Sequence, residues 1–170
     1  MENEQKDKIS AVYDWLDAIV FALTAVMLIF SFVIKSYVVS GSSMDPTLTD
    51  GDRVFAWSLF YTPASGDIVV IDENNGYGEP LVKRVVATGG QTVDIDAAGA
   101  VTVDGEPFQS PVAAGSYNLT GDTAYPVTVP QGYIFVMGDN RAVSYDSRFS
   151  AIGFIDARSV LGREILRIAG

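Results

Sequence analysis

The chain has 170 residues and a net charge of −10 at pH 7, with 21 acidic against 11 basic side chains. This balance argues against a nucleic-acid partner, because binding to phosphate backbones depends on clustered lysine and arginine. The chain contains no histidine and no cysteine. Ser-His-Asp and Cys-His catalytic groups, disulfides and thiolate metal sites are therefore excluded. No carboxylate cluster with metal-ligand spacing and no phosphate-binding glycine loop occurs, so no metal and no cofactor are expected.

The first predicted element is a transmembrane helix over residues 15–35. Residues 18–34 carry no charge, and at about 1.5 Å per residue this run is long enough to cross most of a bilayer. A cleavable signal sequence is less favoured, because its apolar stretch would be shorter and residues 1–14 are acidic rather than basic. A buried core helix is also less favoured, since no polar stripe interrupts the run.

Residues 36–170 follow and are expected to form one domain outside the membrane. Short apolar runs alternate with turn signals, which predicts a mostly β domain. The predicted strands are 53–57, 67–71, 81–87, 92–95, 101–103, 127–129 and 133–137. Ala98-Gly99 predicts a hairpin between the strands on either side of it, and residues 111–126 are predicted to form a long loop.

Shortly after the apolar run comes the segment Ser40-Gly41-Ser42-Ser43-Met44-Asp45-Pro46-Thr47-Leu48. Without an imidazole, a serine nucleophile needs another general base, and a lysine kept neutral by desolvation can supply one. Of four lysines, Lys6 and Lys8 precede the apolar run and Lys35 ends it, a weak bias toward an inside N-terminus. Lys83 is the one that remains, so a Ser43/Lys83 dyad is the leading hypothesis.

Lys83 belongs to the predicted strand over residues 81–87. Alternate side chains of a strand share a face, so Lys83 lies between Leu81 and Val85, while Val82 and Arg84 point the other way. Apolar neighbours disfavour an ammonium group and lower its pKa toward the range in which lysine accepts a proton. The alternative is a lysine on an edge strand that reaches into water.

Several blocks, taken in order, resemble the bacterial type I signal peptidases, which are membrane-bound Ser-Lys endopeptidases that cut leader peptides from exported proteins. After the apolar run and the serine segment, the blocks are Gly51-Asp52-Arg53-Val54, Gly66-Asp67-Ile68-Val69, Val82-Lys83-Arg84-Val85-Val86, and Gly138-Asp139-Asn140-Arg141 with Ser144, Asp146, Ser147 and Arg148. The resemblance covers nearly the whole chain. It implies an antiparallel β-sheet catalytic domain, one N-terminal transmembrane helix, and signal-peptide-bearing precursors and the lipid bilayer as partners.

The resemblance also implies roles for single residues. Ser43 is the nucleophile rather than Ser42, because the serine of the family directly precedes a methionine, and Lys83 is the general base. Ser144 is expected to hydrogen-bond the lysine and orient its amine. The backbone N–H of Ser43 is the first oxyanion donor. Gly41 stands where some members have a second, hydroxyl donor, which leaves that role to the backbone alone or to Ser42.

Substrate pockets and a polar scaffold complete the predicted site. Shallow apolar pockets would accept small residues at the first and third positions before the cut. The resemblance places near them Val39, Met44, Leu48, Leu81 and Val82, for which ordinary core packing is the alternative. The residues expected to form a buried polar scaffold are Arg84, Asp139, Asn140, Arg141, Asp146 and Arg148. For Arg84, both Asp139 and Asp146 are candidate partners.

Together these features predict a cytoplasmic segment 1–14, a membrane helix 15–35 and an extracytoplasmic catalytic domain 36–170 in the plasma membrane. Residues 35–43 reach at most roughly 30 Å when extended at about 3.3 Å per residue, so the nucleophile must lie near the membrane. A self-cleaving repressor would need a DNA-binding module, and penicillin-recognising enzymes a serine three residues before a lysine; the sequence contains neither. A catalytically silent, membrane-anchored β-rich binding module remains the alternative function.

Overall fold

The computed structural model describes residues 2–110 and 119–170. It divides into two compact units, Met1–Lys35 and Ser36–Gly170. The first is one helix, α1 (Glu2–Val33), in which Ala11–Val33 is long and apolar enough to cross a membrane by length and composition. The predicted end at residue 35 is two residues late, because strand β1 begins at Ile34. The helix also starts earlier than predicted, since residues 2–14 contain no proline or glycine that would end it.

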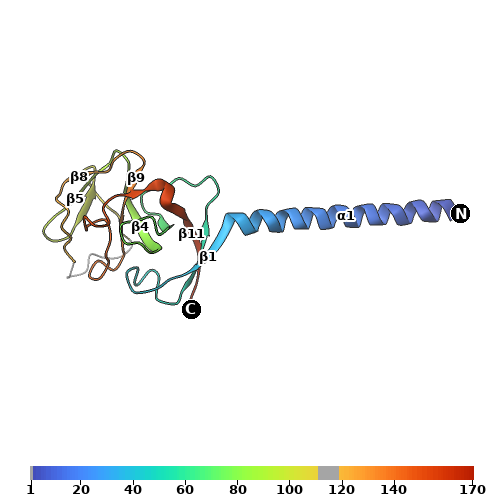
Figure 1. Cartoon of the computed structure of the whole chain (residues 1–170), viewed down its shortest axis with the longest axis horizontal. Coiled ribbons are helices and arrows are strands. Elements are labelled where there is room, and N and C mark those ends of the chain that lie inside the picture. The colour runs from blue at the N-terminus through green and yellow to red at the C-terminus, as the bar shows by residue number, and fades with distance from the viewer. Residues whose placement is uncertain (1, 111–118) are drawn as a thin grey trace. The chain divides into compact units, whose positions relative to one another are not determined.

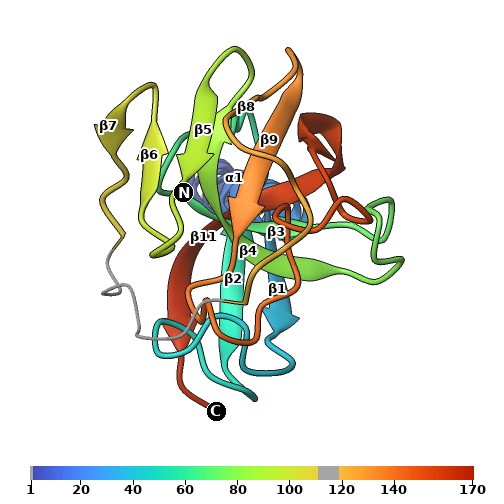
Figure 2. The same cartoon turned by 90° about the vertical axis from the view of Figure 1, so that its left-hand side faces the viewer.

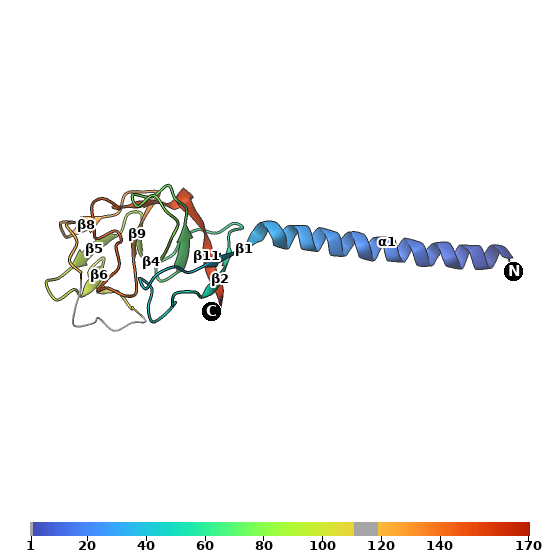
Figure 3. The same ribbon diagram turned by 60° about the horizontal axis from the view of Figure 1, so that its bottom comes forward.

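Ser36–Gly170 is built from two antiparallel sheets, as Figure 2 shows. The larger sheet has the order β1-β2-β11-β3-β4-β9-β10 and consists of β1 (Ile34–Val38), β2 (Arg53–Trp57), β11 (Val160–Ile168), β3 (Ile68–Ile71), β4 (Leu81–Thr88), β9 (Tyr133–Met137) and β10 (Ile155–Asp156). The smaller sheet has the order β7-β6-β5-β8 and consists of β7 (Glu106–Pro107), β6 (Val101–Val103), β5 (Thr92–Ile95) and β8 (Val127–Thr128). A short 3₁₀ helix, η1 (Ala157–Ser159), leads into β11. Figures 1 and 3 agree that β5 and β8 lie at the opposite end of this unit from β11.

The mostly β class is confirmed, and all seven predicted strands are present within about one residue of their predicted ends. The hairpin at Ala98-Gly99 is confirmed, because β5 and β6 pair in antiparallel register on either side of it. The predicted loop 111–126 falls partly on residues 111–118, which lie outside the described residues, and residues 119–126 contain no helix or strand.

Four strands, β1, β7, β10 and β11, were not predicted. The most consequential is β11, which lies between β2 and β3 and pairs with both. This strand could not be recognised from the sequence. The apolar alternation that marks a strand is interrupted there by Gly162, Arg163, Glu164 and Arg167. Gly162 is required there: a methyl group on its Cα would lie 2.7 Å from the Trp57 carbonyl oxygen of the neighbouring strand.

β4 is covered on both faces, unlike many antiparallel strands, which are solvated on one side. Leu81 and Val85 join a cluster with β3 and β9 residues, whereas Val86 packs in a second cluster against the smaller sheet. A third cluster lies under β2 and the serine segment and includes Met44 and Leu48. Six of the eight β4 residues are buried, Lys83 and Arg84 among them.

The cluster that contains Val86 and Phe135 leads to a prediction about stability. Phe135 on β9 is 1% exposed and its ring packs edge-on against the rings of Tyr125 and Phe154. Phe135→Ala should lower the free energy of unfolding by roughly 3–5 kcal/mol, because it loses apolar burial and leaves a cavity. Urea unfolding of the full chain in detergent measures the change.

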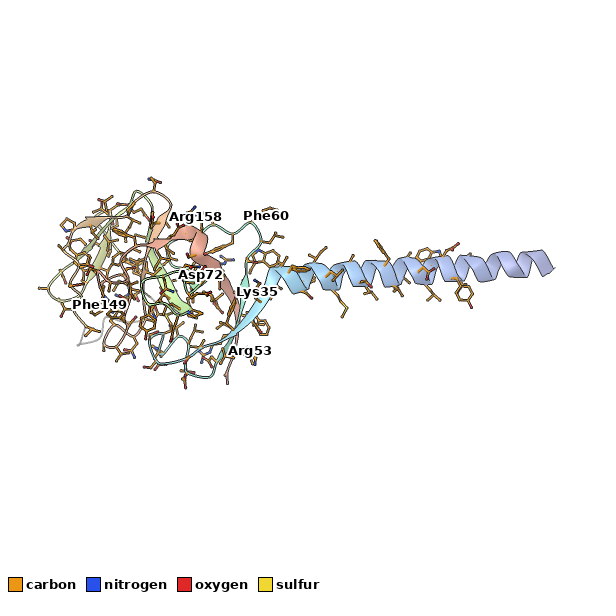
Figure 4. The ribbon with its side chains drawn as sticks, viewed as in Figure 1. Lys35, Arg53, Phe60, Asp72, Phe149 and Arg158 are labelled. Carbon is orange, nitrogen blue, oxygen red and sulfur yellow. The ribbon has the colours of Figure 1, made fainter. Side chains whose placement is uncertain are left out.

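Phe60 supplies the matched control. It is 97% exposed and is drawn on an outer loop after β2 in Figure 4. Phe60→Ala should change the free energy of unfolding by less than about 0.5 kcal/mol. Equal losses in both variants would contradict the assignment of Phe135 to the core.

Candidate active site

Ser43 lies in the turn segment between β1 and β2, and its apolar neighbours anchor that segment. Met44 and Leu48 are each 1% exposed, and the Leu48 amide donates to the Met44 carbonyl at 3.0 Å. Gly41 has a φ of 85°, a conformation that a residue with a side chain adopts only under strain. Ser43 itself is only partly buried, unlike Met44 beside it.

Lys83 projects from the middle of β4 and is 3% exposed. Its Nζ donates to Ser43 Oγ at 2.8 Å. Burial lowers the pKa of Lys83 from 10.5 to about 8; the Asp146 carboxylate partly opposes this shift and the Arg148 guanidinium adds to it. The structure thus brings together the two residues that the sequence singled out, and a large fraction of the amine is neutral near pH 8.

The segment after β9 contacts the serine from another side. The Asn140 backbone N–H donates to the Ser43 carbonyl at 3.0 Å, and Asn140 Nδ2 donates to the Ser42 carbonyl at 3.1 Å. A methyl group on Gly138 would collide with both the Ser43 carbonyl and the Ser144 hydroxyl. The glycine therefore permits the close approach of these three residues.

Two buried ion pairs support this arrangement. Arg84 donates from Nε and Nη2 to the two Asp139 oxygens at 2.7 Å each, which selects Asp139 from the two partners left open by the sequence. Arg148 instead pairs with Asp146, with Nε to Oδ1 at 2.8 Å. Arg141 Nε donates to the Gly138 carbonyl at 3.0 Å. These side chains satisfy one another's charges and hydrogen bonds, as buried ionised groups require.

The observed surroundings of Ser144 differ from the expected hydrogen bond to Lys83. Ser144 is fully buried, yet its Oγ has no hydrogen-bond partner among the described residues, whereas the sequence interpretation paired it with Lys83. The lysine donates to Ser43 instead. Buried hydroxyl groups without a partner are rare, so Ser144 Oγ is an available group next to the dyad.

The two expected oxyanion donors, the backbone N–H groups of Gly41 and Ser43, differ in whether they already make a hydrogen bond. The Gly41 N–H already donates to Asp50 Oδ1 at 2.7 Å. Within residues 2–110 and 119–170, the Ser43 N–H has no hydrogen-bond acceptor. The Ser43 amide is thus the one that remains available to an oxyanion.

The expected pocket residues fall into two groups. Val39, Met44 and Leu48 lie in one buried cluster with Val82 at its margin, whereas Leu81 belongs to the cluster on the other face of β4. Val82 is the partly exposed member. No group of three acidic side chains in the described part of the chain is arranged to hold a metal ion.

Three polar residues were not identified from the sequence. Thr47 Oγ1 donates to Asp139 Oδ2 at 2.5 Å. Arg167, from β11, forms an ion pair with the 1% exposed Asp52 at 2.7 Å and donates to the Thr47 carbonyl at 2.5 Å. Thr47 and Asp52 stand inside recognised blocks and were within reach of sequence reasoning. Arg167 could not be identified from the sequence, because the strand that carries it was not predicted.

The burial of the Lys83 amine leads to a prediction about the stability of the folded chain. Unfolded Lys83 keeps its proton up to about pH 10.5, whereas folded Lys83 releases it near pH 8, so burial opposes folding most strongly below pH 8. Lys83→Met should therefore be more stable than the wild type at pH 7, by on the order of 3 kcal/mol. The difference should shrink as the pH rises from about 8 to 10.5. Urea unfolding of both chains across this range measures it, and a difference independent of pH would contradict the lowered pKa.

Comparison with known proteins agrees with these observations. A family model described as signal peptidase, peptidase S26, matches residues 12–169. Signal peptidase I of Bacillus licheniformis is 37% identical over 95% of this chain and 90% of its own length. Signal peptidase I P of Bacillus subtilis subsp. natto is 35% identical over 98% and 94%. A crystal structure of a signal peptidase I from Enterococcus faecalis is 27% identical, covers 61% of this chain and 97% of its own, and has a TM-score of 0.49. From the family model and the Bacillus sequences, the chain belongs to the signal peptidase S26 family and is an enzyme of the signal peptidase I type.

Proposed function

We propose that this enzyme removes signal peptides from exported precursor proteins with Ser43 as nucleophile and Lys83 as general base. The observation that carries the proposal is the 2.8 Å contact between Lys83 Nζ and Ser43 Oγ. Signal peptide removal follows from family membership. The assignment of the two residues rests on their geometry, on the burial of the lysine and on the absence of any histidine from the chain.

The first step forms an acyl-enzyme. Neutral Lys83 accepts the proton of the Ser43 hydroxyl as Oγ attacks the scissile carbonyl carbon. The C–N bond then breaks, and Lys83 returns the proton to the leaving amine of the mature protein. An ester joins the signal peptide to Ser43 Oγ.

The second step hydrolyses that ester. After the mature protein leaves, Lys83 accepts a proton from a water molecule, which attacks the ester carbonyl. The C–Oγ bond breaks and Ser43 recovers its proton from Lys83. A lysine with a pKa of about 8 suits both steps, because it accepts and donates a proton readily near neutral pH.

Ser144 and the Ser43 amide complete the proposed machinery. The Ser43 N–H stabilises the negative oxygen of each tetrahedral intermediate. Gly41 contributes less, since its N–H already binds Asp50. The unpaired hydroxyl of Ser144 is proposed to orient the Lys83 amine after a rotation of the Ser144 side chain about its Cα–Cβ bond.

The remaining roles concern the substrate and the membrane. Val39, Met44, Leu48, Leu81 and Val82 are proposed to form the floors of pockets for small side chains. Helix α1 is proposed to span the plasma membrane once, with the segment 1–14 in the cytoplasm and Ser36–Gly170 outside it. Confinement of enzyme and precursor to one membrane raises their effective concentration.

Cleavage assays test the dyad directly. A leader-bearing precursor is incubated with the full chain in detergent, as wild type, Ser43→Ala and Lys83→Ala, between roughly pH 5 and 10. Both variants should lose at least about 10³-fold in kcat, because each removes a group used in both steps. The wild-type kcat should rise with pH through about 8, as Lys83 becomes neutral.

The same assay includes the outcome that favours a silent binding module. A wild type that is inert but still binds the precursor would support that alternative. Activity retained by Lys83→Ala would reject the lysine as the base while leaving the family assignment intact.

Ser144→Ala tests the orienting role. The variant should lower kcat by about 10–100-fold and change the pH at which kcat is half-maximal, while KM stays within about two-fold. Ser147→Ala provides a control, because the Ser147 hydroxyl accepts a hydrogen bond from the Val136 N–H at 3.0 Å rather than contacting a residue of the dyad. An unchanged kcat in Ser144→Ala would remove the serine from the machinery.

A further inference from the structure

Thr47 is joined to the strand of the general base through a single buried carboxylate. Thr47 Oγ1 donates to Asp139 Oδ2 at 2.5 Å. The same Asp139, whose side chain is fully buried, binds Arg84 through both of its oxygens. Arg84 directly follows Lys83 on β4. Thr47 thus connects the segment of the nucleophile to the strand of the base through two strong, charge-assisted contacts.

The neighbouring contacts leave Thr47 as the main side-chain attachment on its part of the segment. Asn140 holds the backbone of Ser42 and Ser43, but Thr47 lies four residues further on. There its carbonyl accepts from Arg167 Nη1 at 2.5 Å, so the residue is held through both its side chain and its backbone. Met44 and Leu48 fix the depth of the segment in the core, whereas apolar packing is non-directional and leaves sliding along the surface less restricted.

We propose that the Thr47 hydroxyl is a positioning group that sets the distance between Ser43 Oγ and Lys83 Nζ. This inference rests on the proposed Ser43/Lys83 dyad. Without the hydroxyl, Asp139 keeps Arg84, so the ion pair and the lysine strand stay in place. The serine segment, however, loses its directional link to that strand. A shift near 1 Å at a reacting atom lowers a rate by about 100-fold.

Thr49 gives a matched comparison within the same segment. Its hydroxyl also donates to a buried carboxylate, Asp52 Oδ2, at 3.0 Å. That carboxylate pairs with Arg167 of β11 rather than with an arginine of β4. Thr49 therefore shares the chemistry of Thr47 but has no connection to the strand of the base.

The experiment compares Thr47→Val, Thr47→Ser and Thr49→Val with the wild type and with Ser43→Ala, as full chains in detergent on a leader-bearing precursor. Thr47→Val should lower kcat by about 10–100-fold, with KM within about two-fold. The pH of half-maximal kcat should stay at its wild-type value, since the burial, the Asp146 carboxylate and the Arg148 guanidinium that set the pKa of Lys83 do not change. Thr47→Ser should keep kcat within about three-fold of wild type, and Thr49→Val should do the same.

Thermal unfolding of each variant separates positioning from stability. A wild-type kcat in Thr47→Val, an equal loss in Thr49→Val, or no recovery in Thr47→Ser would overturn the inference. A Thr47→Val chain that fails to fold would also overturn it, because the hydroxyl would then hold the fold rather than the dyad. An inert wild type or an active Ser43→Ala would refute the dyad itself, which is a different result.

Discussion

The desolvation of the Lys83 amine is the constraint on which the site depends. In water a lysine is protonated at neutral pH and accepts no proton; at 3% exposure its pKa falls to about 8. Lys83 shares this burial with most of β4, which lies between β3 and β9 inside the larger sheet and has six of its eight residues buried. The larger sheet thus supplies the buried surroundings that the proposed general base requires.

Burial of an amine opposes folding, and the neighbouring polar residues limit that cost. Asp139 pairs with Arg84 and Asp146 pairs with Arg148, so these four buried charges compensate one another. The pairs also have direction. The Arg84–Asp139 pair links β4 to the segment after β9, the Asp146–Arg148 pair holds that segment together, and the segment in turn holds the Ser43 backbone through Asn140. Stability and reactivity therefore depend on the same few contacts.

The serine segment combines two kinds of attachment. Met44 and Leu48 enter the core. This apolar packing brings the segment close to the sheet but does little to fix its position along the sheet surface. Hydrogen bonds to Asn140, Asp139 and Arg167 then give it a defined position. Thr47 makes two of these contacts, one through its hydroxyl and one through its carbonyl.

The sequence by itself determined the candidate dyad, the apolar helix and most of the strands. With no histidine and one lysine beyond the apolar run, elimination led to Lys83, and period-two alternation placed it among apolar side chains. These are local or compositional properties. They need no knowledge of which strands pair.

Only the tertiary structure decided the partners. Arg84 meets Asp139 rather than Asp146, residues 55 and 62 positions away along the chain, and Arg167 meets Thr47 across 120 positions. The position of β11 between β2 and β3 could not be predicted either. Charged residues interrupt the apolar alternation of this strand, which faces solvent on one side. Such contacts depend on strand order and register, which arise from the packing of the whole domain and leave no periodic trace in any one segment.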